Sequence, residues 1–205
     1  MAYEIKKAAV LGAGVMGATI AAHLTNAGIE CVLLDIIPFE LTEADKAQGL
    51  TEKSPAWRNR FAANGLAGVL KSRPAGFFTK KNASMIRTGN FEDNLGWLAD
   101  ADWVIEVVIE NLKIKQDLFA RVEKVVRPDC IVTTNTSGIP IRDISAQFGA
   151  KLKEHFLGTH FFNPPRYMKL LEVIPGKETR PEIVTFITRF CEQVLGKGVV
   201  ICKDV

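Results

Sequence analysis

The 205-residue sequence has few of the residues that build metal centres and disulfide frameworks. It contains three histidines and four cysteines, and no two cysteines form a CxxC pair. The cysteines lie far apart, each among apolar neighbours, at Cys31, Cys130, Cys191 and Cys202. This pattern predicts buried, reduced thiols rather than disulfides or metal ligands. It fits a reducing cytoplasm, and we expect no metal site.

Long apolar runs and a strong charge of one sign are also absent. No run reaches the roughly 18 residues that a membrane span requires, and the N-terminus lacks the layout of a signal peptide. The net charge is +3, from 26 basic and 23 acidic residues. A nucleic-acid partner calls for a concentrated basic face. We therefore expect neither a membrane span nor a nucleic-acid partner.

The sequence does have an ordinary globular balance, with 47% hydrophobic and 24% charged residues, and a length that suits one large domain. Short apolar runs alternate with helix-like stretches, as in a mostly parallel sheet with helices on both faces. The clearest predicted helices are Met16–Asn26, Lys113–Val126 and Pro181–Leu195. The predicted strands are Ala8–Leu11, Cys31–Leu34, Trp103–Val108, Ile131–Thr134, Gly158–Phe162, Leu170–Ile174 and Val199–Cys202.

The stretch 36–101 is far longer than the single helix that a parallel crossover needs. Helix-like pieces cover Glu40–Lys53 and Pro55–Lys71, so we expect a helical arm that projects from the sheet between the second and third predicted strands. The chain ends at Val205, directly after the last predicted strand. We expect that a longer protein was cut here.

A GxGxxG pattern follows the first predicted strand and opens the first helix, which is the context that gives this pattern meaning. Its first glycine permits a tight turn, its second lets the backbone approach a pyrophosphate, and its third lets helix and strand pack closely. The helix N-terminus adds unpaired N–H groups and a partial positive charge. The predicted dinucleotide-binding loop comprises Gly12, Ala13, Gly14, Val15, Met16 and Gly17.

Asp35 ends the second predicted strand, eighteen residues after Gly17. A carboxylate there can accept hydrogen bonds from the ribose hydroxyls of adenosine and would repel a 2′-phosphate. Ile36 and Ile37 follow, so no arginine stands ready for that phosphate. Both observations favour NAD over NADP. The alternative is a tight turn beside a surface aspartate.

Polar clusters follow three further predicted strands, at the strand ends where ligands of open α/β sheets bind. They are Glu110-Asn111 with Lys115, Asn135-Thr136-Ser137, and His160 with Asn163. Each has a structural alternative. Glu110 or Asn111 could simply cap a helix, and Asn-Thr-Ser is ordinary turn chemistry.

His160 has a carboxylate partner if strands 158–162 and 170–174 form a hairpin. With the loop centred on Arg166, facing residue numbers sum to 332, as those of His160 and Glu172 do. Facing Cβ atoms in an antiparallel pair lie roughly 4.5–5.5 Å apart. At that range a carboxylate can fix an imidazole tautomer and raise its basicity. We predict a catalytic His160–Glu172 pair.

Four segments together resemble the L-3-hydroxyacyl-CoA dehydrogenases of fatty-acid β-oxidation: Gly-Ala-Gly-Val-Met-Gly, Glu-Asn-Leu-Lys-Ile-Lys, Asn-Thr-Ser, and His-Phe-Phe-Asn-Pro-Pro followed by Leu-Leu-Glu-Val-Ile. Their order and spacing match over essentially all of residues 1–205. The resemblance implies a Rossmann-type, doubly wound, mostly parallel sheet with antiparallel strands at its C-terminal end. It also implies NAD-dependent oxidation of 3-hydroxyacyl-CoA to 3-ketoacyl-CoA.

The resemblance also implies a role for each matching residue. His160 would be the general base, Glu172 its orienting partner, and Ser137 a hydrogen-bond donor to substrate. The cofactor would be bordered by Asp35, Glu110, Lys115, Asn135 and Asn163. The helical arm would touch the CoA moiety, where Lys71 and Lys80, with Arg73 and Lys81, are candidates for its phosphates. A solvated basic face explains those four side chains equally well.

In the family, a helical domain follows this point, carries another active-site asparagine, covers the acyl chain and forms the homodimer. That domain is absent from this chain. Two other interpretations stay open. One is a dehydrogenase of the hydroxyisobutyrate or phosphogluconate type, which uses a lysine on the following domain; the His160–Glu172 pair disfavours it. The other is a non-catalytic dinucleotide-binding module.

Overall fold

The computed structural model describes residues 3–204, and within them one eight-stranded sheet runs in the order β3-β2-β1-β4-β5-β6-β7-β8. Its first six strands are parallel, β7 pairs antiparallel with β6, and β8 pairs parallel with β7. This is the doubly wound sheet that the sequence predicts. The strands are β1 (Lys7–Leu11), β2 (Glu30–Asp35), β3 (Ile86–Asn90), β4 (Trp103–Glu106), β5 (Ile131–Thr134), β6 (Phe156–Phe161), β7 (Leu170–Pro175) and β8 (Gly198–Ile201).

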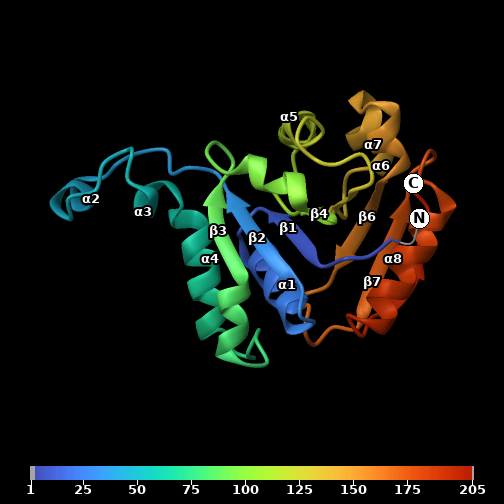
Figure 1. Cartoon of the computed structure of the whole chain (residues 1–205), viewed down its shortest axis with the longest axis horizontal. Helices are drawn as coiled ribbons and strands as arrows, with labels where there is room; N and C mark the ends of the chain where they lie inside the picture. Colours follow the sequence, from blue (N-terminus) through green and yellow to red (C-terminus); the bar gives the residue numbers. More distant parts are fainter. Residues whose placement is uncertain (1–2, 205) are drawn as a thin grey trace.

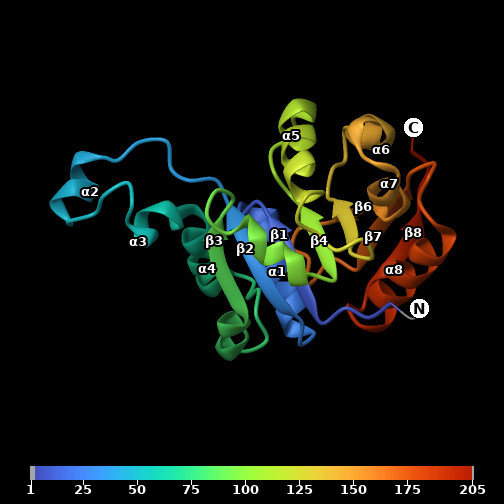
Figure 2. The same ribbon diagram turned by 45° about the horizontal axis from the view of Figure 1, so that its top comes forward.

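Helices cover both faces of the sheet, and each face has its own apolar core (Figures 1 and 2). One core joins the sheet to α1 (Val15–Asn26), α4 (Arg60–Lys71) and α8 (Pro181–Gln193). The other joins it to α5 (Leu112–Val122), α6 (Ile141–Ile144) and α7 (Ala150–Glu154). Successive strand residues alternate between the two cores, which explains why the strand sequences are continuously apolar.

Glycines end two of these helices. Gly28 follows α1 with a φ of 81°, and Gly196 follows α8 with a φ of 66°. Both angles lie in the left-handed region that stops a helix. Pro181 is the first residue of α8, where a backbone N–H would have no hydrogen-bond partner within the helix, so its absence costs nothing.

The stretch 36–101 contains the arm and also a strand that the sequence analysis missed. After β2, the short helices α2 (Glu43–Ala47) and α3 (Pro55–Arg58) extend away from the sheet (Figures 1 and 2). Helix α4 then returns and packs on α1 and β3. A 3-10 helix, η1 (Lys80–Met85), leads into β3, which pairs with β2 at the edge of the sheet. The sequence analysis missed β3 because it contains no apolar run and because Gly89 and Asn90 have low β-propensity.

The base of the arm is anchored by polar contacts. The Nη2 atom of Arg58 lies 2.7 Å from Asp93 Oδ1, and Asn90 Nδ2 donates to Asn59 Oδ1 at 2.6 Å. Arg60 pairs with the buried carboxylate of Asp45. These contacts tie the end of α3 and the start of α4 to the end of β3, and join α4 to α2.

The prediction about cysteines is right for three of the four thiols. Cys31, Cys130 and Cys191 are free and buried, but Cys202 is only half-buried because it follows the exposed edge strand β8. Within residues 3–204, no helix has both the length and the apolar character to cross a membrane.

Candidate functional site

Most of the candidate residues lie at or just after the carboxyl ends of β1, β2, β4, β5 and β6. Strand order reverses between β1 and β4, which are neighbours in the sheet although β2 and β3 follow β1 in the chain. Connections diverge to opposite faces at such a point and leave a crevice. The glycine loop after β1 therefore faces the loop after β4.

Two glycines of the first loop are required by the fold itself. Gly12 has a φ of 105°, and a Cβ built on it would lie 2.6 Å from the carbonyl oxygen of Val107. A Cβ on Gly17 would lie 1.8 Å from the carbonyl oxygen of Gly12. In contrast, a Cβ on Gly14 would meet no described atom within 4 Å. The open space beside Gly14, at the N-terminus of α1, is where a pyrophosphate could approach the backbone.

Asp35 connects the end of β2 to this loop. Its Oδ2 accepts the N–H of Ala13 at 2.6 Å, and its Oδ1 accepts the N–H of Ile36 at 2.7 Å. The carboxylate is half-buried. Each oxygen keeps a second lone pair, so Asp35 can still accept hydrogen bonds from ribose hydroxyls.

Helix α4 forms a wall beside the glycine loop, which the sequence analysis did not foresee. A Cβ on Gly65 would lie 2.3 Å from the carbonyl oxygen of Ala13, so α4 approaches the loop at backbone distance. A cleft of about 510 Å³ lies between α1, α4 and the loop, and its lining includes Val15, Asp35, Phe61 and Gly68. The only sequence sign was a run of small residues within α4.

A buried group of charges lies at the end of β4. The ammonium of Lys115 is 2.8 and 3.0 Å from the two carboxylate oxygens of Glu106, and 3.2 Å from Oε2 of Glu110. The side chains of Lys115 and Glu106 are 1% and 0% exposed. Burial raises the pKa of Glu106, and the neighbouring Lys115 charge opposes that rise. Sequence analysis missed Glu106 because it lies inside an apolar strand.

Glu110 connects this group to the loop after β5. Its Oε1 accepts the hydroxyl of Thr136, the N–H of Gly138 at 3.0 Å and the N–H of Ser137 at 3.2 Å. Partial burial acts to raise the pKa of Glu110, but the hydrogen bonds from Thr136 and Gly138 and the charge of Lys115 outweigh it and lower that pKa. Asn111, not Glu110, caps α5, through the N–H of Ile114 at 3.1 Å.

The loop after β5 also contacts the end of β6. The Oδ1 atom of Asn135 accepts the N–H of Phe161 at 2.8 Å, directly beside His160. Ser137, two residues later, is exposed. The loop therefore places an exposed hydroxyl on the same rim as the imidazole.

His160 faces Glu172 in the register that the sequence predicts. The Nδ1 atom of His160 lies 2.8 Å from Oε2 of Glu172, and the two side chains are 19% and 33% exposed. The ring of Phe162 lies 4.6 Å from the imidazole, centroid to centroid. The carboxylate occupies one ring nitrogen, so Nε2 is the atom available to a ligand.

The remaining candidates lie further out. Asn163 is exposed, in the loop that follows β6. Lys71 ends α4, and Lys80 begins η1, the 3-10 helix that leads into the amino end of β3. The segment between them does contact the loop after His160, because Arg166 donates to the carbonyl oxygens of Ala75 and Phe77 at 2.7 and 2.8 Å.

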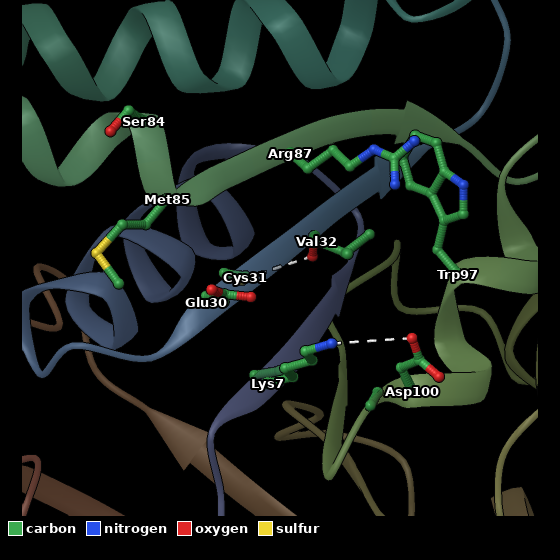
Figure 3. Close-up of a pocket in the computed structure, with 11 residues that line it drawn as sticks. Lys7, Glu30, Cys31, Val32, Ser84, Met85, Arg87, Trp97 and Asp100 are labelled. Carbon is green, nitrogen blue, oxygen red and sulfur yellow. Dashed lines mark hydrogen bonds and ion pairs between the residues drawn. The ribbon is translucent and has the colours of Figure 1, made fainter.

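A second pocket, of about 400 Å³, opens at the amino ends of β1, β2 and β3 (Figure 3). Arg87 stacks over the ring of Trp97 at 3.4 Å, and Lys7 lies 3.8 Å from Asp100. Its lining shares no residue with the loops described above. Ligands of such sheets bind at the other end, so the carboxyl-end rim is the candidate site.

Comparison with known proteins gives a consistent result. Residues 7–205 match the family model described as the NAD-binding domain of 3-hydroxyacyl-CoA dehydrogenase. A probable 3-hydroxyacyl-CoA dehydrogenase of Bacillus subtilis is 51% identical over 201 residues, which cover 98% of this chain and 26% of that protein. Another from Deinococcus radiodurans is 48% identical over 202 residues, 98% of this chain and 54% of that protein. The chain thus spans between a quarter and just over half of these relatives.

A solved structure of a related enzyme has the same fold. The 3-hydroxybutyryl-CoA dehydrogenase of Escherichia coli superposes with a TM-score of 0.72 at 30% sequence identity, over 98% of this chain and 39% of that one.

Proposed function

This chain belongs to the family of 3-hydroxyacyl-CoA dehydrogenase NAD-binding domains, and we propose that it takes part in the oxidation of L-3-hydroxyacyl-CoA to 3-ketoacyl-CoA in fatty-acid β-oxidation. Its cofactor is NAD. The observation that carries the proposal is the His160–Glu172 pair beside a dinucleotide-binding loop. Its buried thiols fit the reducing cytoplasm in which we place it.

The residues present fit NAD. Gly14 leaves open space at the N-terminus of α1, and Asp35 offers a carboxylate to ribose hydroxyls while repelling a 2′-phosphate. Bound NAD would supply the acceptor for the hydride that leaves C3 of the substrate. In this proposal Asn135 and Asn163 border its nicotinamide end, and Glu110 organises the loop beside it.

His160 then acts as the general base. Its Nε2 accepts the proton of the 3-hydroxyl group as the C3–H bond breaks, and the oxygen becomes the ketone. Glu172 holds the Nδ1–H and stabilises the imidazolium that forms. Ser137 donates a hydrogen bond to the reacting oxygen, where charge develops. General-base catalysis of this kind contributes roughly 10²–10⁴-fold.

The rest of the proposal concerns the substrate. The CoA moiety lies against the helical arm within 36–101, with Lys71 and Lys80 near its phosphates. The B. subtilis and D. radiodurans relatives are longer than this chain, and we propose that a following helical domain of such a protein covers the acyl chain and forms a homodimer.

The test is to mix the protein with NAD and an L-3-hydroxyacyl-CoA and to follow NADH absorbance. We expect NADH to form. We also expect the dissociation constant to be at least tenfold lower for NAD than for NADP, because NADP loses the charge-assisted hydrogen bonds between its ribose and Asp35. NAD binding without NADH formation, in a protein long enough to include the following domain, would favour a non-catalytic binding module.

A further inference from the structure

The loop that follows His160 joins the two strands of the hairpin β6–β7. It comprises residues 162–169 and contains the candidate residue Asn163. Within 162–169 only Pro165 is buried, and the other residues are half-buried or exposed. A single residue pair, Phe161 with Leu171, separates this loop from the pair of His160 with Glu172. The conformation of the loop therefore bears directly on the imidazole and its carboxylate.

The ammonium of Lys197 lies beneath this loop. It donates hydrogen bonds to the carbonyl oxygen of Pro165 and, at 3.0 Å, to that of Met168. It also lies 5.4 Å from the centre of the Phe161 ring, within the range of a cation–π contact. Lys197 is only 6% exposed. One buried cation thus contacts two points of the loop and the last residue of β6.

We infer that Lys197 is a positioning residue, which fastens the loop 162–169 to the end of β6 and thereby holds His160 and Asn163 in place for the reaction. The inference rests on the proposed function, since it assigns the purpose of a fixed loop to the general base and to the nicotinamide end of NAD. Lys197 itself lies below the loop and acts through it.

The backbone of Lys197 is fixed on both sides, so its ammonium can hold the loop rather than follow it. Its own N–H donates to the carbonyl oxygen of Cys191 in α8 at 2.9 Å. The N–H of the next residue, Gly198, donates to the carbonyl oxygen of Lys169 at 2.8 Å. Gly198 then begins β8, where it pairs with Leu170 of β7. Lys197 is therefore anchored between a helix and the sheet.

The surroundings of Lys197 offer its charge no counter-ion. Burial lowers the pKa of Lys197 to about 8. From α1, His23 faces it as a neutral ring, since burial lowers the pKa of His23 to about 4. From α8, Cys191 faces it as a neutral thiol, since burial raises the pKa of that thiol.

A buried ammonium without a counter-ion is costly. A methionine at position 197 would fill a similar volume without that cost. The two loop carbonyls would then lose their donor, although a loop this exposed lets water replace it. Stability alone therefore does not favour a lysine here, and the loop that its donors hold explains the residue better.

The experiment uses Lys197→Met, which removes the charge and the donors together. The matched control is Lys169→Met, because Lys169 lies in the same loop but is exposed. The first measurement is hydrogen exchange by NMR at the amides of Tyr167 and Met168, which both donate to the carbonyl oxygen of Pro164 at 2.9 Å. The second is kcat and KM for an L-3-hydroxyacyl-CoA, with the dissociation constant of NAD and the melting temperature.

We expect Lys197→Met to speed exchange at both amides by roughly tenfold or more, because the loop opens more often. We expect kcat to fall by roughly tenfold or more, while the dissociation constant of NAD stays within about threefold. A lysine that only stabilised the fold would lower the melting temperature and leave the kcat of the folded protein unchanged. Lys169→Met should match wild type in every measurement. Unchanged exchange, or unchanged kcat in folded Lys197→Met, overturns the inference.

Should Lys197→Met fail to fold, Lys197→Gln takes its place. The Gln amide keeps a neutral donor, but its side chain is one bond shorter and cannot reach both carbonyl oxygens. It should still speed exchange at Met168 and lower kcat, and wild-type values of both would overturn the inference. The exchange measurement does not depend on turnover, so a wild-type protein that makes no NADH would refute the proposed function separately.

Discussion

His160 and Glu172 face each other across the antiparallel strands β6 and β7, with Nδ1 of the imidazole 2.8 Å from Oε2 of the carboxylate. A hydrogen on Nδ1 completes this contact and leaves the lone pair on Nε2. The pair therefore has the geometry of a general base with its orienting carboxylate. Strand register alone creates it, because the two residues are twelve positions apart.

Replacement of His160 by Gln should separate chemistry from cofactor binding. We expect NADH formation to fall by roughly 10²–10⁴-fold, because no other group would accept the hydroxyl proton. The dissociation constant of NAD, measured by calorimetry, should stay within about threefold, since β4 and β5 separate β6, which carries His160, from β1 and its glycine loop. A loss confined to NAD binding would reverse the roles assigned here.

The Asp35 carboxylate should set cofactor selectivity. Asp35→Ala removes its hydrogen bonds to ribose and should weaken NAD binding by about 10–100-fold, the value of a charge-assisted hydrogen bond. Asp35→Asn keeps an acceptor for the Ala13 N–H but removes the charge, so it should preserve the loop and mainly relax discrimination against NADP. Parallel titrations with NAD and NADP check both variants. Selectivity unchanged in Asp35→Ala would exclude this role.

Two glycines of one loop should respond differently to alanine. Gly17→Ala places a methyl group 1.8 Å from a carbonyl oxygen and should destabilise the fold by about 1–3 kcal/mol or more. Gly14→Ala meets no described atom within 4 Å, so the melting temperature should change little while NAD affinity drops at least tenfold, because the methyl group occupies the approach of the pyrophosphate. Thermal melts of both variants measure the change in stability, and NAD titrations measure the change in affinity. Full NAD affinity in a folded Gly14→Ala protein would place the pyrophosphate elsewhere.

Acid should destabilise the fold through His23. Burial, with the nearby charge of Lys197, lowers the pKa of His23 from 6.5 to about 4, while Nε2 donates to the carbonyl oxygen of Leu195. The unfolded chain therefore binds more protons between these values, so the stability from His23 is present above pH 6.5 and is lost as pH falls toward 4. The loss is on the order of 3 kcal/mol at most.

Denaturant unfolding at a series of pH values measures this effect. His23→Gln can keep a donor to the Leu195 carbonyl and should flatten the pH dependence in this range. The difference between the two proteins isolates His23 from the other titrating groups. Equal slopes would show that His23 is not buried as a neutral ring.

Much of the fold could be predicted because strands covered on both faces leave apolar runs, as β1, β2 and β5 do. The strand β3 could not be predicted. It lies at an edge, and Gly89 and Asn90 are buried there without an apolar side chain. Such a strand is specified by its neighbours, here β2 and α4, rather than by its own composition.

Site contacts that follow from the spacing of residues along the strands could be predicted from the sequence. Contacts that depend on which side chains are buried were harder to predict. The facing of His160 and Glu172 followed from hairpin register. The burial of Lys115 did not follow, because a lysine after a strand is ordinarily solvated. Its counter-ion Glu106 looked like an interruption of an apolar strand, although a carboxylate nine residues before a lysine could have suggested a buried pair.

The most direct test of the account is an isotope measurement. The protein is incubated with NAD and an L-3-hydroxyacyl-CoA that carries deuterium at C3, and the NADH is analysed by mass spectrometry. The account predicts deuterated NADH from the wild-type protein, reduced in His160→Gln by roughly 10²-fold or more. Deuterated NADH formed equally fast by His160→Gln would contradict it.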